Sequence, residues 1–193
     1  MDRRRVVFID TTPNSQALQF RENPLFNSWL QSFNNIPAAL TFIEQNPSPC
    51  ATDVYLAKDN ILDDGLPEPL NGRMRTLIRT LDELQSIKHI TVFTSDKPTD
   101  ISVEIRCILS TQRTLEDVIP TDNLECHMCR KRMGYLQQSI DDYIDTEEAH
   151  LIDNILRDIT DLHEHMGRLI NNLRQRVDPI LETHSNRPGQ QPS

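Results

Sequence analysis

Two kinds of apolar segment alternate along residues 1–120. Short runs of β-branched and aromatic residues begin near residues 6, 53, 89 and 105, as expected for strands that are buried on both faces. Between these runs, apolar residues recur every three or four positions over 24–33, 37–45 and 70–87, which is the spacing of amphipathic helices. Strands that alternate with helices favour a parallel sheet covered on both faces. We therefore expect the α/β fold class, as a three-layer sandwich with four or five parallel strands.

Two stretches of this region have weaker patterns. An additional strand is predicted near residues 32–36, where the apolar spacing of the preceding helix ends. The stretch "TLEDVIP", residues 114–120, is predicted to form a short helix or a turn that ends at Pro120.

The pattern changes after Pro120, because residues 122–177 contain no proline and their apolar residues keep helical spacing. This spacing falters at Glu147 and Glu148, which favours a hairpin of two helices over one long broken helix. The last residues are rich in proline and glutamine. We therefore expect an α/β domain over 1–120, a helical hairpin or coiled-coil extension over 121–178, and a disordered tail over 179–193.

One stripe of the second predicted helix resembles a coiled-coil seam, because its residues are spaced alternately by three and four. We call this stripe the apolar seam, and its members are Ile152, Ile155, Ile159, Leu162, Met166, Leu169 and Leu173. Such a narrow stripe is not stable as an isolated helix. Its partner is expected to be the sister helix, the sandwich or another copy of the chain.

Composition limits the classes of function. The net charge of -9 argues against nucleic acid as a partner. The apolar run after the first arginines has the length of a strand, so neither a secretory signal nor a membrane span is predicted. The four cysteines are therefore expected to be reduced thiols in an intracellular, cytoplasmic protein.

Candidate chemistry lies where three predicted strands end. The stretch "DVYLAKDNILDDG" carries an apolar run into Asp59, the run "VVFID" ends at Asp10, and "HITVFTSD" reaches Thr94. The carboxyl ends of parallel strands share one edge of a sheet, which is where α/β proteins bind ligands. Asp10, Asp59 and Thr94 are therefore the candidate residues for accepting a phosphoryl group or holding a metal ion.

The stretches "VVFID", "TDVYLAKD", "HITVFTSD" and "IRCILSTQRTLEDVIP" together resemble the receiver domain of response regulators, over roughly residues 3–120. They resemble even more the degenerate receiver-like domains found beside tetratricopeptide repeats and arginine ADP-ribosyltransferase domains in some invertebrate multidomain proteins. The resemblance implies a flavodoxin-like fold. In an active receiver it also implies acidic residues after the first and third strands that hold Mg²⁺, a phosphoacceptor aspartate, a hydroxyl and a lysine.

The sequence departs from that pattern at several of these positions. The first strand supplies Asp10 but is followed by Thr11 and Thr12 instead of a second acid. The alignment places Lys58 at the phosphoacceptor, with Asp59 one residue late, and the predicted fifth strand over 105–111 has no lysine–proline pair. A cation among the carboxylates would weaken a magnesium site.

The helical part contains a possible zinc site. In "ECHMCRKR", Cys126 and Cys129 share a helix face, and a turn near residue 145 would place His163 or His165 beside them. The alternative is that Cys129 is a small core residue, Cys126 a half-exposed thiol, and the histidines part of a polar face. His89 and His150 are predicted to be surface residues.

We therefore expect a pseudo-receiver without enzymatic activity or a cofactor, which acts in protein–protein interaction or in self-association through the apolar seam. The first alternative is a phosphorylation-dependent receiver that uses Asp10 and Asp59 with Mg²⁺. The second is a fragment or relative of a multidomain protein containing an ADP-ribosyltransferase, although no motif of that activity is present in the chain.

Overall fold

The chain forms two compact units, Met1–Glu125 and Cys126–Ser193. The boundary predicted from the sequence lies between residues 120 and 121. The residues that the computed structural model describes are 5–11, 16–45, 51–58, 72–84, 86–95, 98, 102, 115–144 and 149–185.

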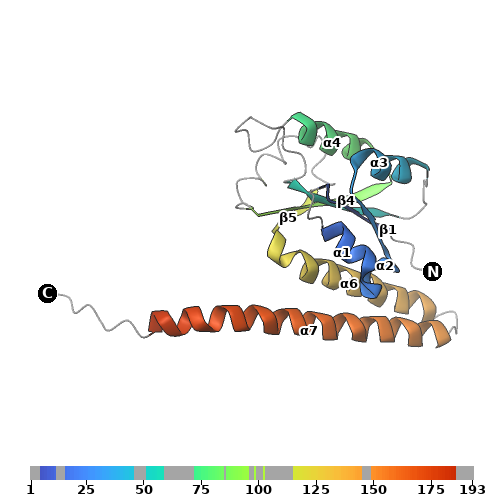
Figure 1. The fold of residues 1–193 in the computed structure, drawn as a ribbon. Coiled ribbons are helices and arrows are strands. Elements are labelled where there is room, and N and C mark those ends of the chain that lie inside the picture. Colours follow the sequence, from blue (N-terminus) through green and yellow to red (C-terminus); the bar gives the residue numbers. More distant parts are fainter. Residues whose placement is uncertain are drawn as a thin grey trace. The chain divides into compact units, whose positions relative to one another are not determined.

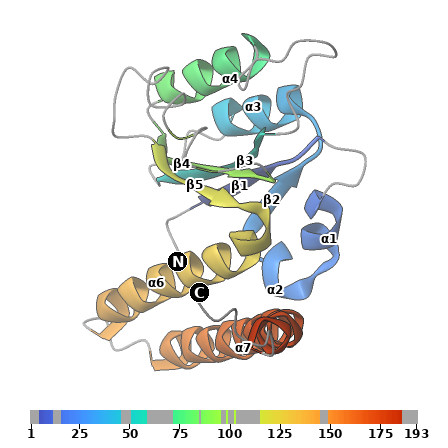
Figure 2. The same cartoon turned by 90° about the vertical axis from the view of Figure 1, so that its left-hand side faces the viewer.

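The first unit is built on a parallel sheet (Figures 1 and 2). Its five strands are β1 (Arg5–Ile9), β2 (Leu30–Phe33), β3 (Thr52–Ala57), β4 (Ile87–Thr94) and β5 (Leu115–Pro120). They are arranged in the order β2-β1-β3-β4-β5, and every neighbouring pair is parallel. This order is the one found in flavodoxin-like folds. The predicted α/β fold class is confirmed.

Helices lie on both faces of the sheet, which gives the three layers of a sandwich (Figure 2). On one face are α3 (Ile36–Gln45) and α4 (Gly72–Glu83), and on the other are α1 (Gln16–Glu22) and α2 (Pro24–Asn27). Asparagine side chains cap two of these helices. Asn23 Oδ1 accepts a hydrogen bond from the Leu25 backbone N–H at the start of α2, and Asn35 Oδ1 accepts one from Ala38 in the first turn of α3.

The main hydrophobic core lies between the sheet and the α3–α4 layer. Alternate residues of β1, β3 and β4 point toward these helices, because successive side chains of a strand lie on opposite faces. The buried members of the core are Val7, Ile9, Ala39, Ile43, Val54, Leu56, Leu77, Ile78, Leu81, Ile87, Ile90, Val92 and Val118. The regularly spaced apolar residues that predicted α3 and α4 are therefore the residues that pack these helices against the sheet.

Aromatic rings fill the opposite face of the sheet. Phe8 on β1 stacks on Phe93 of β4 at 5.2 Å and meets Phe20 of α1 edge-on at 5.0 Å. Phe20 in turn contacts Phe26 of α2, whose ring lies 5.6 Å from that of Trp29. These contacts attach α1 and α2 to the sheet.

The single helix expected over 24–33 is wrong. The helical part is the four-residue α2, and Leu30–Phe33 forms β2 at the edge of the sheet, paired with β1. Leu30 and Ser32 are buried while Gln31 is exposed, so this segment has the two-residue period of a strand. The apolar residues at 29, 30 and 33 fit the helical period, and pairing with β1 overrides this local signal.

The short helix or turn expected over 114–120 is also wrong, because Leu115–Pro120 is the edge strand β5. Among the described strands, it pairs with β4 alone. Such an edge strand tolerates Pro120 at its end, because proline has no backbone N–H to donate. Its register shifts beside Ile90 and Thr91, and this irregularity hides the alternation of its side chains. The strand expected over 105–111 lies outside the described residues.

The second unit consists mainly of two helices that lie side by side in both views, α6 (Leu124–Ile144) and α7 (Ala149–Ser185) (Figures 1 and 2). Arg132 on α6 and Asp158 on α7 interact electrostatically, so these two residues lie on the sides of the helices that face each other. With 37 residues against 21, α7 is longer than α6 and extends beyond it (Figure 1).

The disordered tail expected over 179–193 is wrong for its first part, because α7 continues through Pro179 to Ser185. A proline removes one hydrogen bond from the helix interior and tends to bend the helix there. The backbone on both sides nevertheless stays helical. Residues 186–193 lie outside the described residues.

The Arg132–Asp158 pair generates the first prediction. Burial lowers the pKa of the Arg132 guanidinium, and the attraction of Asp158 raises it, so the loss of solvation is the larger of the two effects. Replacing Asp158 with asparagine leaves a buried cation without this attraction. Because Asp158 itself is exposed and screened by water, we expect D158N to lower the free energy of unfolding by about 1 kcal/mol.

The measurement is urea unfolding followed by far-ultraviolet circular dichroism. Glu164→Gln is the matched control, because it removes one negative charge from an exposed position on the same helix and is expected to change stability by less than about 0.5 kcal/mol. Equal stabilities of the two variants would contradict the prediction.

Candidate functional site

Three polar residues are buried where neighbouring strands end. Asp10 directly follows β1, Lys58 directly follows β3, and Thr94 is the last residue of β4. Because β3 lies between β1 and β4, these residues belong to one continuous part of the carboxyl edge. This is the edge at which flavodoxin-like folds bind ligands.

The strand register sets the level of each residue along the sheet. Ile9, Leu56 and Val92 are side by side, so Asp10 lies at the level of Ala57 and Phe93, one residue before the level of Lys58 and Thr94. The backbone N–H of Asp10 donates to the Phe33 carbonyl oxygen at 3.0 Å, which holds Asp10 in place at the end of β1. With strands about 4.8 Å apart, Asp10 and Thr94 are separated by roughly 10 Å of sheet.

Lys58 gives this edge an unusual electrostatic character. Only 9% of its surface is exposed, although lysine is seldom buried unless its charge is matched by a partner. Asp10, Lys58 and Thr94 thus bring a carboxyl group, an amino group and a hydroxyl group to this edge. This set can bind a small anion or form a hydrogen-bond network, whereas Mg²⁺ requires several oxygen ligands and is repelled by a cation.

Asp59, the third residue predicted for this site, lies outside the described residues. The structure therefore brings Asp10 and Thr94 to the same edge without placing Asp59 relative to them. No group of three or more His, Cys, Asp or Glu side chains with the arrangement of a metal site occurs among the residues that the structure describes.

The residues predicted for a zinc site are distributed over both helices of the second unit. On α6, Cys129 is buried and Cys126 is half-buried. On α7, His163 is exposed and His165 is half-buried, with its Nδ1 3.5 Å from an Arg168 guanidinium nitrogen. Within the described helices, the two cysteines and His163 do not form a metal-binding group.

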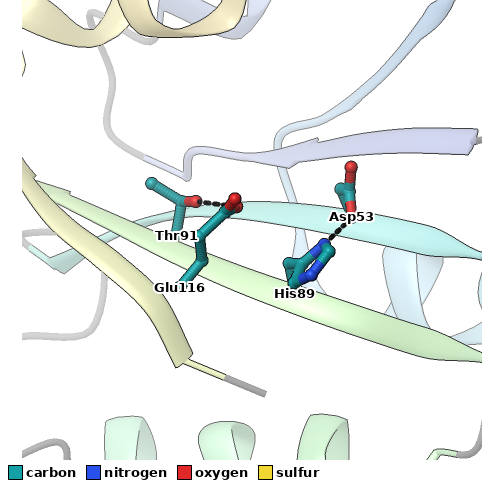
Figure 3. A network of polar contacts seen from close by, with 4 residues as sticks. All are labelled: Asp53, His89, Thr91 and Glu116. Carbon is teal, nitrogen blue, oxygen red and sulfur yellow. Dashed lines mark hydrogen bonds and ion pairs between the residues drawn. The ribbon is translucent and has the colours of Figure 1, made fainter. Parts of the chain in front are cut away.

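A second polar group lies on the sheet itself, toward the amino ends of its strands (Figure 3). His89 Nδ1 on β4 is 2.8 Å from Asp53 Oδ1 on β3, because the register places these two residues opposite each other. Asp53 is only 1% exposed, whereas 36% of the His89 side chain is exposed. The imidazole therefore links a buried carboxyl group to the surface.

Thr91 continues this polar group along β4. Its Oγ1 donates to Glu116 Oε2 on β5 at 3.5 Å, which is a weak hydrogen bond (Figure 3). Glu116 falls where the register between β4 and β5 shifts, so it has no direct opposite residue on β4. On β2, Ser32 Oγ is buried without a hydrogen-bond partner among the described residues.

The Asp53–His89 pair was missed in the sequence, where His89 was expected to be a surface residue with no partner. The two residues are 36 positions apart, and only the register of β3 and β4 brings them together. The one available signal was an acidic residue at the start of an otherwise apolar strand. His150, the other histidine expected at the surface, is exposed.

Comparisons of the chain with protein-family models, with curated proteins and with solved structures find no match in any of the three. Among the described helices, none has the length and apolar character that crossing a membrane would require.

The Asp53–His89 pair generates the second prediction. We expect His89→Leu to lower the free energy of unfolding by about 2 kcal/mol, because it leaves the buried Asp53 carboxyl group without this partner. The double variant Asp53→Asn with His89→Leu should cost less than the sum of the two single changes, since both remove the same interaction. Chemical unfolding of the four proteins measures this coupling.

Lys88→Leu serves as the control for a polar-to-leucine change on the same strand. Lys88 directly precedes His89 and is exposed, so its effect should stay within about 0.5 kcal/mol. Strictly additive effects of the two single substitutions would show that the Asp53–His89 contact contributes nothing to stability.

Proposed function

We propose that this chain is a receiver-like module without phosphotransfer activity, which acts through protein–protein contacts made by its two long helices. The supporting observation is the buried Lys58 at the end of β3. The resemblance to receiver domains assigns the phosphoacceptor aspartate to this position.

A lysine in this position opposes both steps of receiver chemistry. It is not a carboxylate that can form an acyl phosphate, and its positive charge weakens the binding of the Mg²⁺ that such a reaction requires. Asp10 is the acidic residue that follows β1, and β5 ends in Val118, Ile119 and Pro120 without a lysine. The proposal therefore keeps the fold of the receiver and assigns no reaction to it.

The interaction role is supported by the second unit. α7 has 37 residues against 21 in α6, and its charged and apolar residues follow a heptad-like spacing. The apolar seam continues to Leu169 and Leu173 in the second half of α7, which is the longer helix. Helices that extend apolar stripes beyond their own hairpin are a common means of protein association.

The proposal predicts that the chain is not phosphorylated by small phosphodonors. After incubation with acetyl phosphate and Mg²⁺, the intact mass should be unchanged, because no carboxylate occupies the position of the nucleophile. An active receiver domain treated in the same way provides the positive control. A stable mass increase of about 80 Da, equal to one phosphoryl group, would overturn the proposal.

Three variants separate the sources of such an adduct. An adduct that disappears in Asp59→Asn but persists in Lys58→Met would establish the alternative, a phosphorylation-dependent receiver with a displaced nucleophile. An adduct lost in Asp10→Asn alone would identify Asp10 as the acceptor. Either result excludes the non-catalytic function.

A further inference from the structure

Two large apolar side chains of α7 are exposed on the same stripe of the helix. Leu156 is 49% exposed and Ile170 is 42% exposed. They are fourteen residues apart, which is four turns, so they lie within about 40° of each other around the helix axis and about 21 Å apart along it. The exposed His163 lies midway between them on this stripe. We call Leu156, His163 and Ile170 the outer stripe.

The outer stripe is symmetric about His163. Leu156 precedes His163 by seven residues and Ile170 follows it by seven. If two copies of α7 lie antiparallel with the two-fold axis at His163, Leu156 of each copy meets Ile170 of the other. A two-fold contact requires this kind of self-complementary surface, in which residue i meets residue j and residue j meets residue i.

The flanking charges fit the same register. Asp153 lies ten residues before His163, and Arg174 lies eleven residues after it, and both are exposed on the same side of the outer stripe. In the antiparallel arrangement, Asp153 of each copy is next to Arg174 of the other. The two pairs are equivalent by symmetry, so the arrangement places opposite charges together twice.

Small residues occupy the positions between these charges and the axis. Thr160 and Gly167 are exposed on this side of the stripe, three residues before and four residues after His163. A Cβ atom added at Gly167 would meet no atom within 4 Å. The same register places Thr160 opposite Gly167 of the other copy, which allows two helices to approach closely.

We infer that the outer stripe of α7 is a homodimer interface, in which a second copy of this chain packs antiparallel about a two-fold axis at His163, with Asp153 paired to Arg174 across the interface. The inference rests on the proposed function, in that it identifies one partner of α7 as the chain itself. The apolar seam remains a separate stripe, so the hairpin with α6 is kept in the dimer.

Reversing the charge of Asp153 or of Arg174 tests the proposed dimer interface. Asp153→Arg places two arginines together at each end of the interface, and Arg174→Asp places two aspartates together. Each variant alone should weaken dimerisation about tenfold relative to the unchanged chain. An equimolar mixture of the two variants should restore dimers of unchanged affinity, because every arginine then faces an aspartate in the heterodimer.

The matched controls carry the same charge changes on the opposite face of α7. Asp161→Arg and Arg168→Asp lie well away from the outer stripe, and both positions are exposed. They should leave the dimerisation constant unchanged, alone or mixed. Sedimentation equilibrium of the full-length chain from low micromolar to near-millimolar concentration measures all of these constants, and circular dichroism verifies that each variant is folded.

A second set of variants removes the apolar contacts without changing charge. Leu156→Ser and Ile170→Ser should each weaken the dimer, because each contact occurs twice across the two-fold axis. Both positions are exposed in the single chain, so these substitutions should leave its folding intact.

The outcomes separate this inference from the proposed function. A chain that stays monomeric at all concentrations overturns the inference, while the acetyl phosphate reaction still decides whether the module is catalytic. Dimers that tolerate Asp153→Arg and Arg174→Asp as well as the control variants overturn the register proposed for α7 and leave self-association through another surface. Recovery of dimers only in the mixture of the two reversed variants supports the inference.

Discussion

A parallel sheet is buried on both faces, and most other features of the first unit follow from this constraint. The inner strands are nearly continuous runs of apolar residues, and helices cover both faces of the sheet. The side chains packed between the sheet and the helices differ between the two faces. Aliphatic residues fill the side of α3 and α4, and stacked aromatic rings fill the side of α1 and α2. Polar residues are consequently concentrated where strands end, and Asp10, Lys58 and Thr94 reach the same edge for that reason.

The same constraint makes polar residues inside the sheet costly, so those that occur there need partners. Asp53 is buried within β3 and is matched by His89 on the next strand. Lys58 is buried at the end of the same strand. Neither position is needed for a well-packed sheet, because an apolar residue would be less costly at both. We interpret Asp53 and His89 as a pair that favours the observed register of β3 and β4, since a slip by one residue would bury the carboxyl group without the imidazole.

The inner strands and long helices could be predicted because their signals are local. The apolar runs of β1, β3 and β4 and the periodicity of α3, α4 and α7 are each contained in a few consecutive residues. The edge strand β2 was predicted only in part, as a strand near residues 32–36, and β5 was predicted as a helix or turn. Both segments are short, and pairing with a neighbouring strand decides their structure. For the same reason the sequence identified Asp10 and Thr94, which follow apolar runs, but missed the Asp53–His89 contact between strands 36 residues apart.

The fold alone does not determine whether the carboxyl edge is chemically active, because flavodoxin-like sheets support both catalytic and binding proteins. The proposed binding role therefore depends on residue types: the buried Lys58 stands at the end of β3, where an aspartate would be needed to accept a phosphoryl group. In the proposed function the module acts through its surface, and α7 offers a surface with internal symmetry. The reflection of Leu156 onto Ile170 about His163, with Asp153 next to Arg174, is not required by a hairpin with α6, which uses the apolar seam. Pairing with a second copy supplies a physical reason for both patterns on a single helix.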